Sequence, residues 1–287
     1  MIGSETRAID RMAMLPTEQL LDAAFAAGGP CGAGRVLTFG QEPEAGPAMP
    51  TADDACSWRG LLGGGVHVWT MDLGADRIDD ARHLALLDLE EQERAARFAF
   101  PVHRQRFIRR HAIGRRILAR YLDCAPEEIR FAYGDYDKPC LAPTQNQRCL
   151  QFSASSSEDV GCLAVTLNRA VGVDVEVPTK AKREAWRSVA ETAFHRDEVA
   201  ALLRLPAERA GEMFFRLWTL KEAYCKALGT GLQSLEQAPS LHQIAADDSG
   251  GACPLSHLGR TWLCQSLALP NSGAALVVEQ RGPSAAS

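Results

Sequence analysis

Four side chains in the second half of the chain have the types and the spacing of a site that binds a cation and a phosphate group. Asp174 and Glu176 stand two residues apart, and Glu222 and Lys226 stand four residues apart. Carboxylate oxygens suit hard cations such as Mg²⁺, which usually binds one or two carboxylates together with water and substrate phosphate. Three acids and a lysine that converge from two elements can therefore hold a divalent cation against a phosphate.

The first pair lies in a segment with the pattern of a β-strand. Valines alternate with Gly172, Asp174 and Glu176 between positions 171 and 177, which is the period-two pattern of a strand. Side chains two residues apart share a face and are separated by about 6.5–7 Å. We therefore expect both acids to point the same way, and Gly172 to leave room for a neighbouring backbone or a ligand. An ordinary strand with one polar face would give the same pattern.

The second pair lies in a predicted helix. Apolar residues recur at helical spacing over residues 209–228, and Gly229 supplies a stop signal. Glu222 and Lys226 lie on the flank of the apolar stripe together with Trp218. A surface ion pair of this spacing is common and contributes only about 0.3–0.5 kcal/mol. Neither pair is specific alone, but their combination, in this order and 46 residues apart, is.

Together the two segments resemble a known family. Gly172-Val-Asp-Val-Glu176 and Trp218-Thr-Leu-Lys-Glu-Ala-Tyr-Cys-Lys226 look like the paired signature of the 4′-phosphopantetheinyl transferase superfamily, and most closely of its surfactin-synthetase-activating, two-lobed type. Asp137-Lys-Pro-Cys-Leu141 resembles the family's Gly-Lys-Pro-x-Leu turn. Phe152-Ser-Ala-Ser-Ser-Ser157 resembles its Phe-Asn-x-Ser-His-Ser strand. The resemblance covers about residues 66–280.

The resemblance implies a magnesium-dependent transferase with holo-[acyl-carrier-protein] synthase activity. Such an enzyme moves the 4′-phosphopantetheine group of coenzyme A to a serine of an apo acyl or peptidyl carrier protein and releases adenosine 3′,5′-bisphosphate. It implies that Asp174, Glu176 and Glu222 hold the metal. Glu222 would also deprotonate the serine, and Lys226 would stabilise the leaving bisphosphate.

The resemblance also implies contacts to the phosphates of coenzyme A. Between positions 94 and 122 the chain has nine arginines and no acid, although its formal net charge is −5, so this block implies an anionic partner. Coenzyme A and an acidic carrier-protein helix both qualify. We expect Lys221, which points away from Glu222, to be a phosphate or surface contact. The expected coenzyme A contacts are Lys138, Ser155, Ser156, Arg97, Arg106 and Lys226.

One departure from the family pattern concerns binding strength. Ser156 stands where the family has a histidine that contacts phosphate, and a hydroxyl carries no positive charge. We therefore expect weaker binding of coenzyme A, and a catalytically weakened homologue that only binds carrier proteins stays an alternative. A metal-dependent phosphohydrolase is a second alternative, because the three acids would serve it equally.

The resemblance implies an α+β fold, a pseudo-twofold duplication of two similar α/β lobes with the active site between them. We expect a flexible extension over residues 1–60 with a short helix near 17–27, lobes over 61–167 and 168–281, and a loose tail over 282–287. Since a two-lobed chain could complete by itself a site that short relatives build between subunits, we expect a monomer.

Composition excludes several other classes. The chain is 46% hydrophobic and 23% charged, as ordinary globular proteins are. It has no run of 18 apolar residues and opens on no signal-like segment, so we expect neither a membrane span nor secretion. Nine cysteines without a C-x-x-C pair suit a reducing cytoplasm. An acidic chain without a nucleic-acid-binding motif argues against a nucleic-acid partner.

Overall fold

The computed structural model describes residues 36–39, 61, 64–74, 80–134, 136–231, 235 and 238–280. The helix expected near residues 17–27 and the tail 282–287 lie outside these ranges. Strand β1 (Val36–Phe39) falls within the range 1–60 and pairs in parallel with strand β2 (Val66–Asp72). Part of the expected extension therefore belongs to a sheet, and the domain boundaries stay a prediction.

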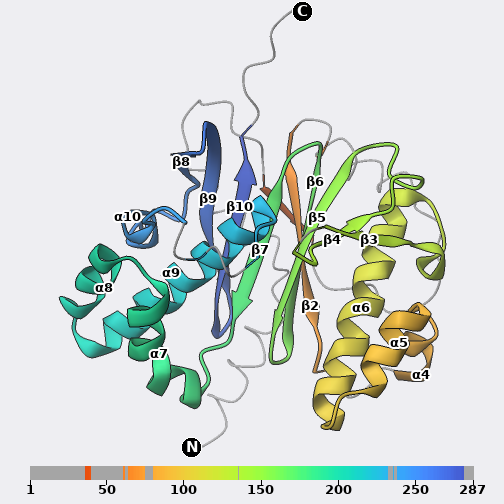
Figure 1. The fold of residues 1–287 in the computed structure, drawn as a ribbon, viewed down its shortest axis with the longest axis horizontal. Helices are drawn as coiled ribbons and strands as arrows, with labels where there is room; N and C mark the ends of the chain where they lie inside the picture. The colour runs from red at the N-terminus through yellow and green to blue at the C-terminus, as the bar shows by residue number, and fades with distance from the viewer. Residues whose placement is uncertain are drawn as a thin grey trace, which may run out of the picture.

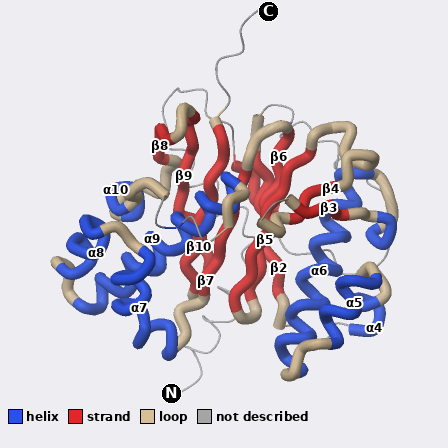
Figure 2. The backbone as a smooth tube through the Cα atoms, viewed as in Figure 1, coloured by secondary structure: helices blue, strands red, loops and turns tan. Residues whose placement is uncertain are grey.

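Two four-stranded sheets form the centre of the molecule, and helices cover their outer faces (Figures 1 and 2). The first sheet has the order β1-β2-β6-β5 and the second the order β7-β10-β9-β8. All pairs except β1–β2 are antiparallel. Beyond β1 and β2, the strands of the two sheets are β5 (Leu150–Ser157), β6 (Val160–Leu167), β7 (Val171–Glu176), β8 (Cys253–His257), β9 (Arg260–Leu269) and β10 (Ser272–Glu279).

Each sheet has its own set of helices. None of the helices in the described ranges is both long and apolar enough to cross a membrane. A short strand pair, β3 (Phe131–Tyr133) and β4 (Pro139–Leu141), follows the helices of the first half. The helices are α4 (Asp80–Leu84), α5 (Leu89–Ala96), α6 (Pro101–Leu122) and the 3-10 helix η2 (Pro126–Glu128) in the first half, and α7 (Lys180–Ala193), α8 (Arg196–Leu203), α9 (Ala207–Leu228) and α10 (His242–Ala245) in the second.

Apolar residues fill three layers between these elements. One core lies between α6 and the first sheet, and another between α7–α10 and the second sheet. The third joins the two sheets, because Val66 and Val68 of β2 pack in one cluster with Val171, Val173 and Val175 of β7. These three valines of β7 are at most 1% exposed, as their alternation predicts. The opposite face of β7 is thereby left for α9.

The α+β class is confirmed, and the two halves follow similar paths. In the first half β2 leads into α4–α6, and a later hairpin returns β6 beside β2. In the second half β7 leads into α7–α10, and a later hairpin returns β10 beside β7. Duplication as the origin of this likeness stays a prediction. The strand predicted over residues 171–177 and the helix predicted over 209–228 are present as β7 and α9. Periodicity signals none of β1, β4, β8 and α10, because each has five residues or fewer.

Candidate functional site

A glycine allows α9 to lie directly on β7. A Cβ atom added to Gly172 would stand 1.9 Å from the carbonyl oxygen of Ala223 and 2.5 Å from the nitrogen of Ala227. Only a residue without a side chain permits this approach of helix to strand. Because Gly172, Asp174 and Glu176 share one face of β7, the same approach brings α9 over the acids. Residues 48 and 52 positions apart in the chain thus become neighbours, because Glu222 and Lys226 of α9 lie over Asp174.

The centre of the site is Asp174, whose side chain is only 3% exposed. Its Oδ1 accepts hydrogen bonds from Lys226 Nζ at 2.5 Å and from Ser155 Oγ of β5 at 2.7 Å. Lys226 Nζ also donates to Ser155 Oγ at 3.0 Å, and it lies 3.8 Å from Glu222 Oε2. Three elements, β5, β7 and α9, therefore meet at one partly buried cluster of charge.

Two features of this cluster are typical of a site that binds a ligand. Asp174 Oδ2 is buried and has no hydrogen-bond partner among the described residues, although a buried polar atom usually has one. Burial, together with the neighbouring Asp174 carboxylate, raises the pKa of Glu222 to about 8. Groups with shifted pKa values are concentrated at functional sites. Near neutral pH the Glu222 carboxyl therefore keeps its proton, which a bound cation would displace.

The third predicted metal ligand is turned to a different lysine. The Glu176 carboxylate forms an ion pair with Lys182 in the first turn of α7. Lys182 Nζ also donates to Ser157 Oγ at 3.1 Å and to the carbonyl oxygen of Val177 at 3.4 Å. No sequence signal indicates a role for Lys182, since nothing in the local pattern distinguishes it from Lys180.

Alternate serines of β5 join the two sheets. Ser153 Oγ accepts from the backbone N–H of Val173 at 3.1 Å, and Ser157 Oγ accepts from that of Val177 at 3.0 Å. These two hydroxyls satisfy backbone N–H groups along the edge of β7 that no neighbouring strand of its sheet covers, whereas Ser155 bonds to the side chain of Asp174. Ser156 points to the other face and is exposed. The two predicted serine contacts thus differ: Ser155 binds Asp174, whereas Ser156 contacts none of these residues. The sequence signal for this arrangement is that Ser153, Ser155 and Ser157 stand two residues apart, which places them on one face of the strand.

Lys138 lies against the end of α9. Its Nζ donates to the carbonyl oxygen of Lys226 at 2.6 Å and to that of Val171 at 3.2 Å. Lysine near a helix C-terminus commonly satisfies the last carbonyls in this way. Burial lowers the pKa of Lys138 to about 8. The side chain adjoins the site but is bound to backbone, and its contact with phosphate stays a prediction.

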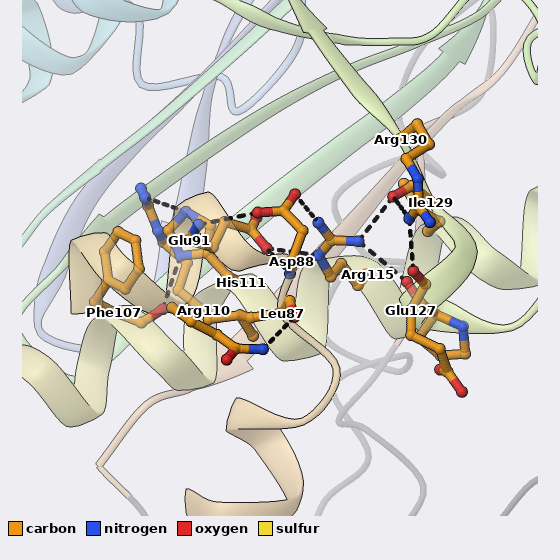
Figure 3. A network of polar contacts seen from close by, with 12 residues as sticks. Leu87, Asp88, Glu91, Phe107, Arg110, His111, Arg115, Glu127, Ile129 and Arg130 are labelled. Carbon is orange, nitrogen blue, oxygen red and sulfur yellow. Dashed lines mark hydrogen bonds and ion pairs between the residues drawn. The ribbon is translucent and has the colours of Figure 1, made fainter. Parts of the chain in front are cut away.

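The arginine block is largely used to hold the first half together. Arg115 is fully buried and pairs with Asp88 and Glu91 (Figure 3). Arg106 ties α6 to the turn between β5 and β6, through Glu158 at 2.9 Å and Asp159 at 2.8 Å. Salt bridges within the protein thus account for part of a pattern that predicted an anionic partner.

The other arginine assigned to coenzyme A lies elsewhere. Arg97 is 75% exposed and faces Glu93 on α5, a helix on the outer side of the first sheet (Figure 1). The structure does not bring Arg97 to the cluster around Asp174, so its role in binding coenzyme A stays a prediction.

The prediction that Lys221 is a phosphate or surface contact is wrong. Its side chain is fully buried, and Nζ donates to Glu198 Oε2 at 2.9 Å. Glu198 also accepts from the backbone N–H groups of His195 and Leu241, so its carboxylate is fully used. Trp218 stacks on Phe214 in the adjacent aromatic cluster. These parts of the motif fix the position of α9.

The residues present fit a divalent cation in part. Asp174 Oδ2 and the carboxyl of Glu222 are hard oxygen donors in a buried position, as Mg²⁺ requires. In the described ranges, no three acidic, histidine or cysteine side chains are grouped as they would be around a bound metal ion, and Glu176 is engaged by Lys182. Convergence of all three acids on one ion stays a prediction.

Comparison with known proteins agrees with these motifs. A model of the 4′-phosphopantetheinyl transferase superfamily matches residues 170–275, from the start of β7 into β10. The 4′-phosphopantetheinyl transferase HetI of Nostoc sp. is 37% identical over 179 residues, which span 62% of this chain and 74% of HetI. AcpT of Escherichia coli is 36% identical over 50% of this chain and 69% of its own length. Sfp of Bacillus subtilis is 24% identical over 56% and 69%.

The region of similarity contains the four candidate residues for binding a cation and a phosphate group: Asp174, Glu176, Glu222 and Lys226. Identity of 37% over three-quarters of a relative is too extensive for a chance match of two short motifs. The chain therefore belongs to the 4′-phosphopantetheinyl transferase superfamily.

Proposed function

We propose that this protein transfers the 4′-phosphopantetheine group of coenzyme A to a serine of an apo acyl or peptidyl carrier protein and releases adenosine 3′,5′-bisphosphate. Family membership supports the reaction class. The observation that carries the proposal is the cluster in which Glu222 and Lys226 of α9 meet Asp174 of β7, with one buried oxygen of Asp174 unsatisfied.

The chain's own residues can supply the base and the positive charge that this reaction needs. The serine Oγ of the carrier protein forms a bond to the β-phosphorus of coenzyme A while the phosphoanhydride bond breaks. Glu222 accepts the serine proton, and its partly buried carboxyl beside Asp174 suits the role of a general base. Lys226 places a positive charge beside the bisphosphate that leaves. Mg²⁺, held by Asp174 and Glu222 and joined by Glu176, would neutralise phosphate charge.

Mass spectrometry of a carrier protein tests this proposal directly. The protein is mixed with coenzyme A, MgCl₂ and an apo carrier domain, and intact mass is followed with time. We expect a gain of one phosphopantetheine on the carrier serine and stoichiometric release of adenosine 3′,5′-bisphosphate. A carrier domain with that serine changed to alanine is the control and should gain nothing.

Two other outcomes would reject the proposal in different ways. Hydrolysis of simple phosphoesters without any change in the carrier domain would indicate a metal-dependent phosphohydrolase. Binding of the carrier domain without transfer, at saturating coenzyme A, would indicate a weakened homologue in which Ser156 fails to replace histidine. A monomeric state, a cytoplasmic location and a coenzyme A site reaching Ser156 and Lys138 belong to the same proposal.

A further inference from the structure

Two lysines, on two different helices, face the acids of β7. Lys226 of α9 bonds to Asp174, and Lys182 of α7 pairs with Glu176. Each ammonium group takes one oxygen of an acid that is a candidate ligand of a divalent cation, and Asp174 Oδ2 has no hydrogen-bond partner in the part of the chain that the structure describes. They are not equivalent, because Lys226 belongs to the paired signature whereas Lys182 follows the strand outside it.

We propose that Lys182 competes with the divalent cation for the Glu176 carboxylate and thereby sets the affinity of the acidic site for metal. This inference rests on the proposed function, because that function calls for a cation at these acids. A carboxylate oxygen that pairs with an ammonium group must release it, at least in part, before it can bind a metal ion. Each binding event therefore includes the breaking of one ion pair.

The geometry of Lys182 makes it well suited to this competition. Its side chain is 37% exposed, whereas that of Glu176 is 19% exposed, so the ammonium group can turn outward into water while the carboxylate stays in the site. Besides Glu176, Lys182 Nζ donates to Ser157 Oγ and to the carbonyl oxygen of Val177, and water can replace these acceptors when the ammonium group turns outward. Displacement thus leaves no buried charge unpaired, which keeps its cost small.

The alternative is that Lys182 positions Glu176 for the metal. In that case loss of the ammonium group would weaken metal binding rather than strengthen it. The pairing of Glu176 with Lys182, rather than with the lysine that bonds to Asp174, favours competition, since a cation shared by the three acids has to replace that ion pair. Without the ammonium group, competition predicts tighter binding of the metal and positioning predicts weaker binding, so one titration distinguishes them.

Isothermal titration calorimetry with MgCl₂, at constant ionic strength, gives the decisive measurement. We compare the whole wild-type protein with Lys182→Met and with the matched control Lys180→Met. Lys180 also stands in the first turn of α7, is 92% exposed and lies 3.9 Å from Glu184. Both variants lose one positive charge from the same turn, so general charge effects cancel. Partly exposed ion pairs of this kind predict an affinity increase of about two- to fivefold in Lys182→Met alone.

A second measurement does not depend on the variant being well folded. Nitrogen-15 NMR of the lysine side chains in the wild-type protein should show the Lys182 Nζ resonance changing as Mg²⁺ is added, while that of Lys180 stays in place. Unchanged or weaker Mg²⁺ binding in Lys182→Met, or a Lys182 resonance that Mg²⁺ leaves unmoved, would overturn the inference.

The transfer assay separates this inference from the proposed function. If the wild-type protein modifies the carrier domain but Lys182→Met and Lys180→Met bind Mg²⁺ equally, only the role of Lys182 is wrong. If no transfer occurs and the wild type and Lys182→Met both fail to bind Mg²⁺, the proposed function fails and the inference with it. Loss of binding in Asp174→Asn identifies the titrated site as this one.

Discussion

Each half of the molecule contains a cluster in which one basic side chain meets two acids, and the two clusters differ in how completely their bonds are made. In the first half, Arg115 donates to Glu91 at 2.8 Å, to Asp88 at 2.5 Å and to the carbonyl oxygens of Pro126 and Ile129 (Figure 3). Its planar guanidinium fits such a set of acceptors. Asp88 and Glu91 also form the capping box of α5.

In the second half, the bonds are incomplete. Lys226 donates to Asp174 Oδ1, but Asp174 Oδ2 has no partner in the described ranges and Glu222 lies 3.8 Å from the ammonium group. An unsatisfied buried acceptor costs stability. Burial and charge alone therefore do not identify a functional site in this protein. The cluster with acceptors left over can take a ligand, whereas the completed one holds helices together.

The largest effect should come from Glu222. Glu222→Gln removes the proposed base while keeping the size and polarity of the side chain, so we expect the rate of phosphopantetheine transfer to fall by about 10²–10⁴-fold. Initial rates at saturating coenzyme A and carrier domain measure this. Full activity in this variant would contradict the assignment of the base.

The same variant tests the pKa of Glu222 through stability. Because the folded-state pKa is raised from 4.5 to about 8, the contribution of Glu222 to the free energy of unfolding is fully present below about pH 4.5 and is lost as pH rises through about 8. Urea denaturation without metal, from pH 5 to 9, should show Glu222→Gln gaining stability relative to the wild type as pH increases. Parallel profiles would mean that Glu222 titrates normally.

Arg115→Met should break the completed cluster. Removing one partner leaves two carboxylates without their donor, and loss of one side of a buried ion pair typically costs about 3–5 kcal/mol of unfolding free energy. Urea denaturation provides the measurement, with the exposed Arg97→Met as control and an expected change within about 0.5 kcal/mol. Folded Arg115→Met should keep its transfer rate. A large loss of rate in fully folded protein would show that the two clusters are not independent.

Gly172→Ala tests whether close packing of α9 on β7 builds the site. The added methyl group meets backbone atoms at 1.9 Å, so the helix must move, and overpacking of this kind costs about 1–3 kcal/mol. Transfer should decrease as well, because Glu222 and Lys226 move with α9. Gly211→Ala in the same helix is the matched control: its nearest neighbour would be 4.0 Å away, and helix propensity favours alanine. Equal stability in the two variants would refute the packing argument.

The smallest effect should separate Ser155 from Ser156. Ser155→Ala removes one hydrogen bond to a buried carboxylate, which predicts a loss of about tenfold in kcat. Ser156→Ala, on the other face of β5, should leave kcat unchanged and alter at most the KM for coenzyme A. Steady-state kinetics distinguishes the two. If Ser156→Ala lowered kcat and Ser155→Ala did not, the reacting groups would lie on the face of β5 that carries Ser156.

Local patterns determined much of this molecule. Alternating valines predicted β7 and the common face of Asp174 and Glu176, and helical periodicity with a glycine stop predicted α9, which ends at Leu228 before Gly229 with φ 76°. These features follow from the backbone geometry of single elements, so neighbouring residues suffice to specify them. The same patterns carried the resemblance to the superfamily, and thus the reaction class.

Tertiary structure decided which charges are available. Lys221 and Lys226 lie in one motif, yet one is buried against Glu198 and the other reaches Asp174. Lys182 pairs with Glu176, although Lys180 stands two residues away. A long charged side chain takes its partner from whichever segment folding brings beside it. The partners of Lys221 and Lys226 lie 23 and 52 residues away in the chain, and Lys182 reaches Glu176 across the turn between β7 and α7, so no periodic pattern could have assigned the pairs.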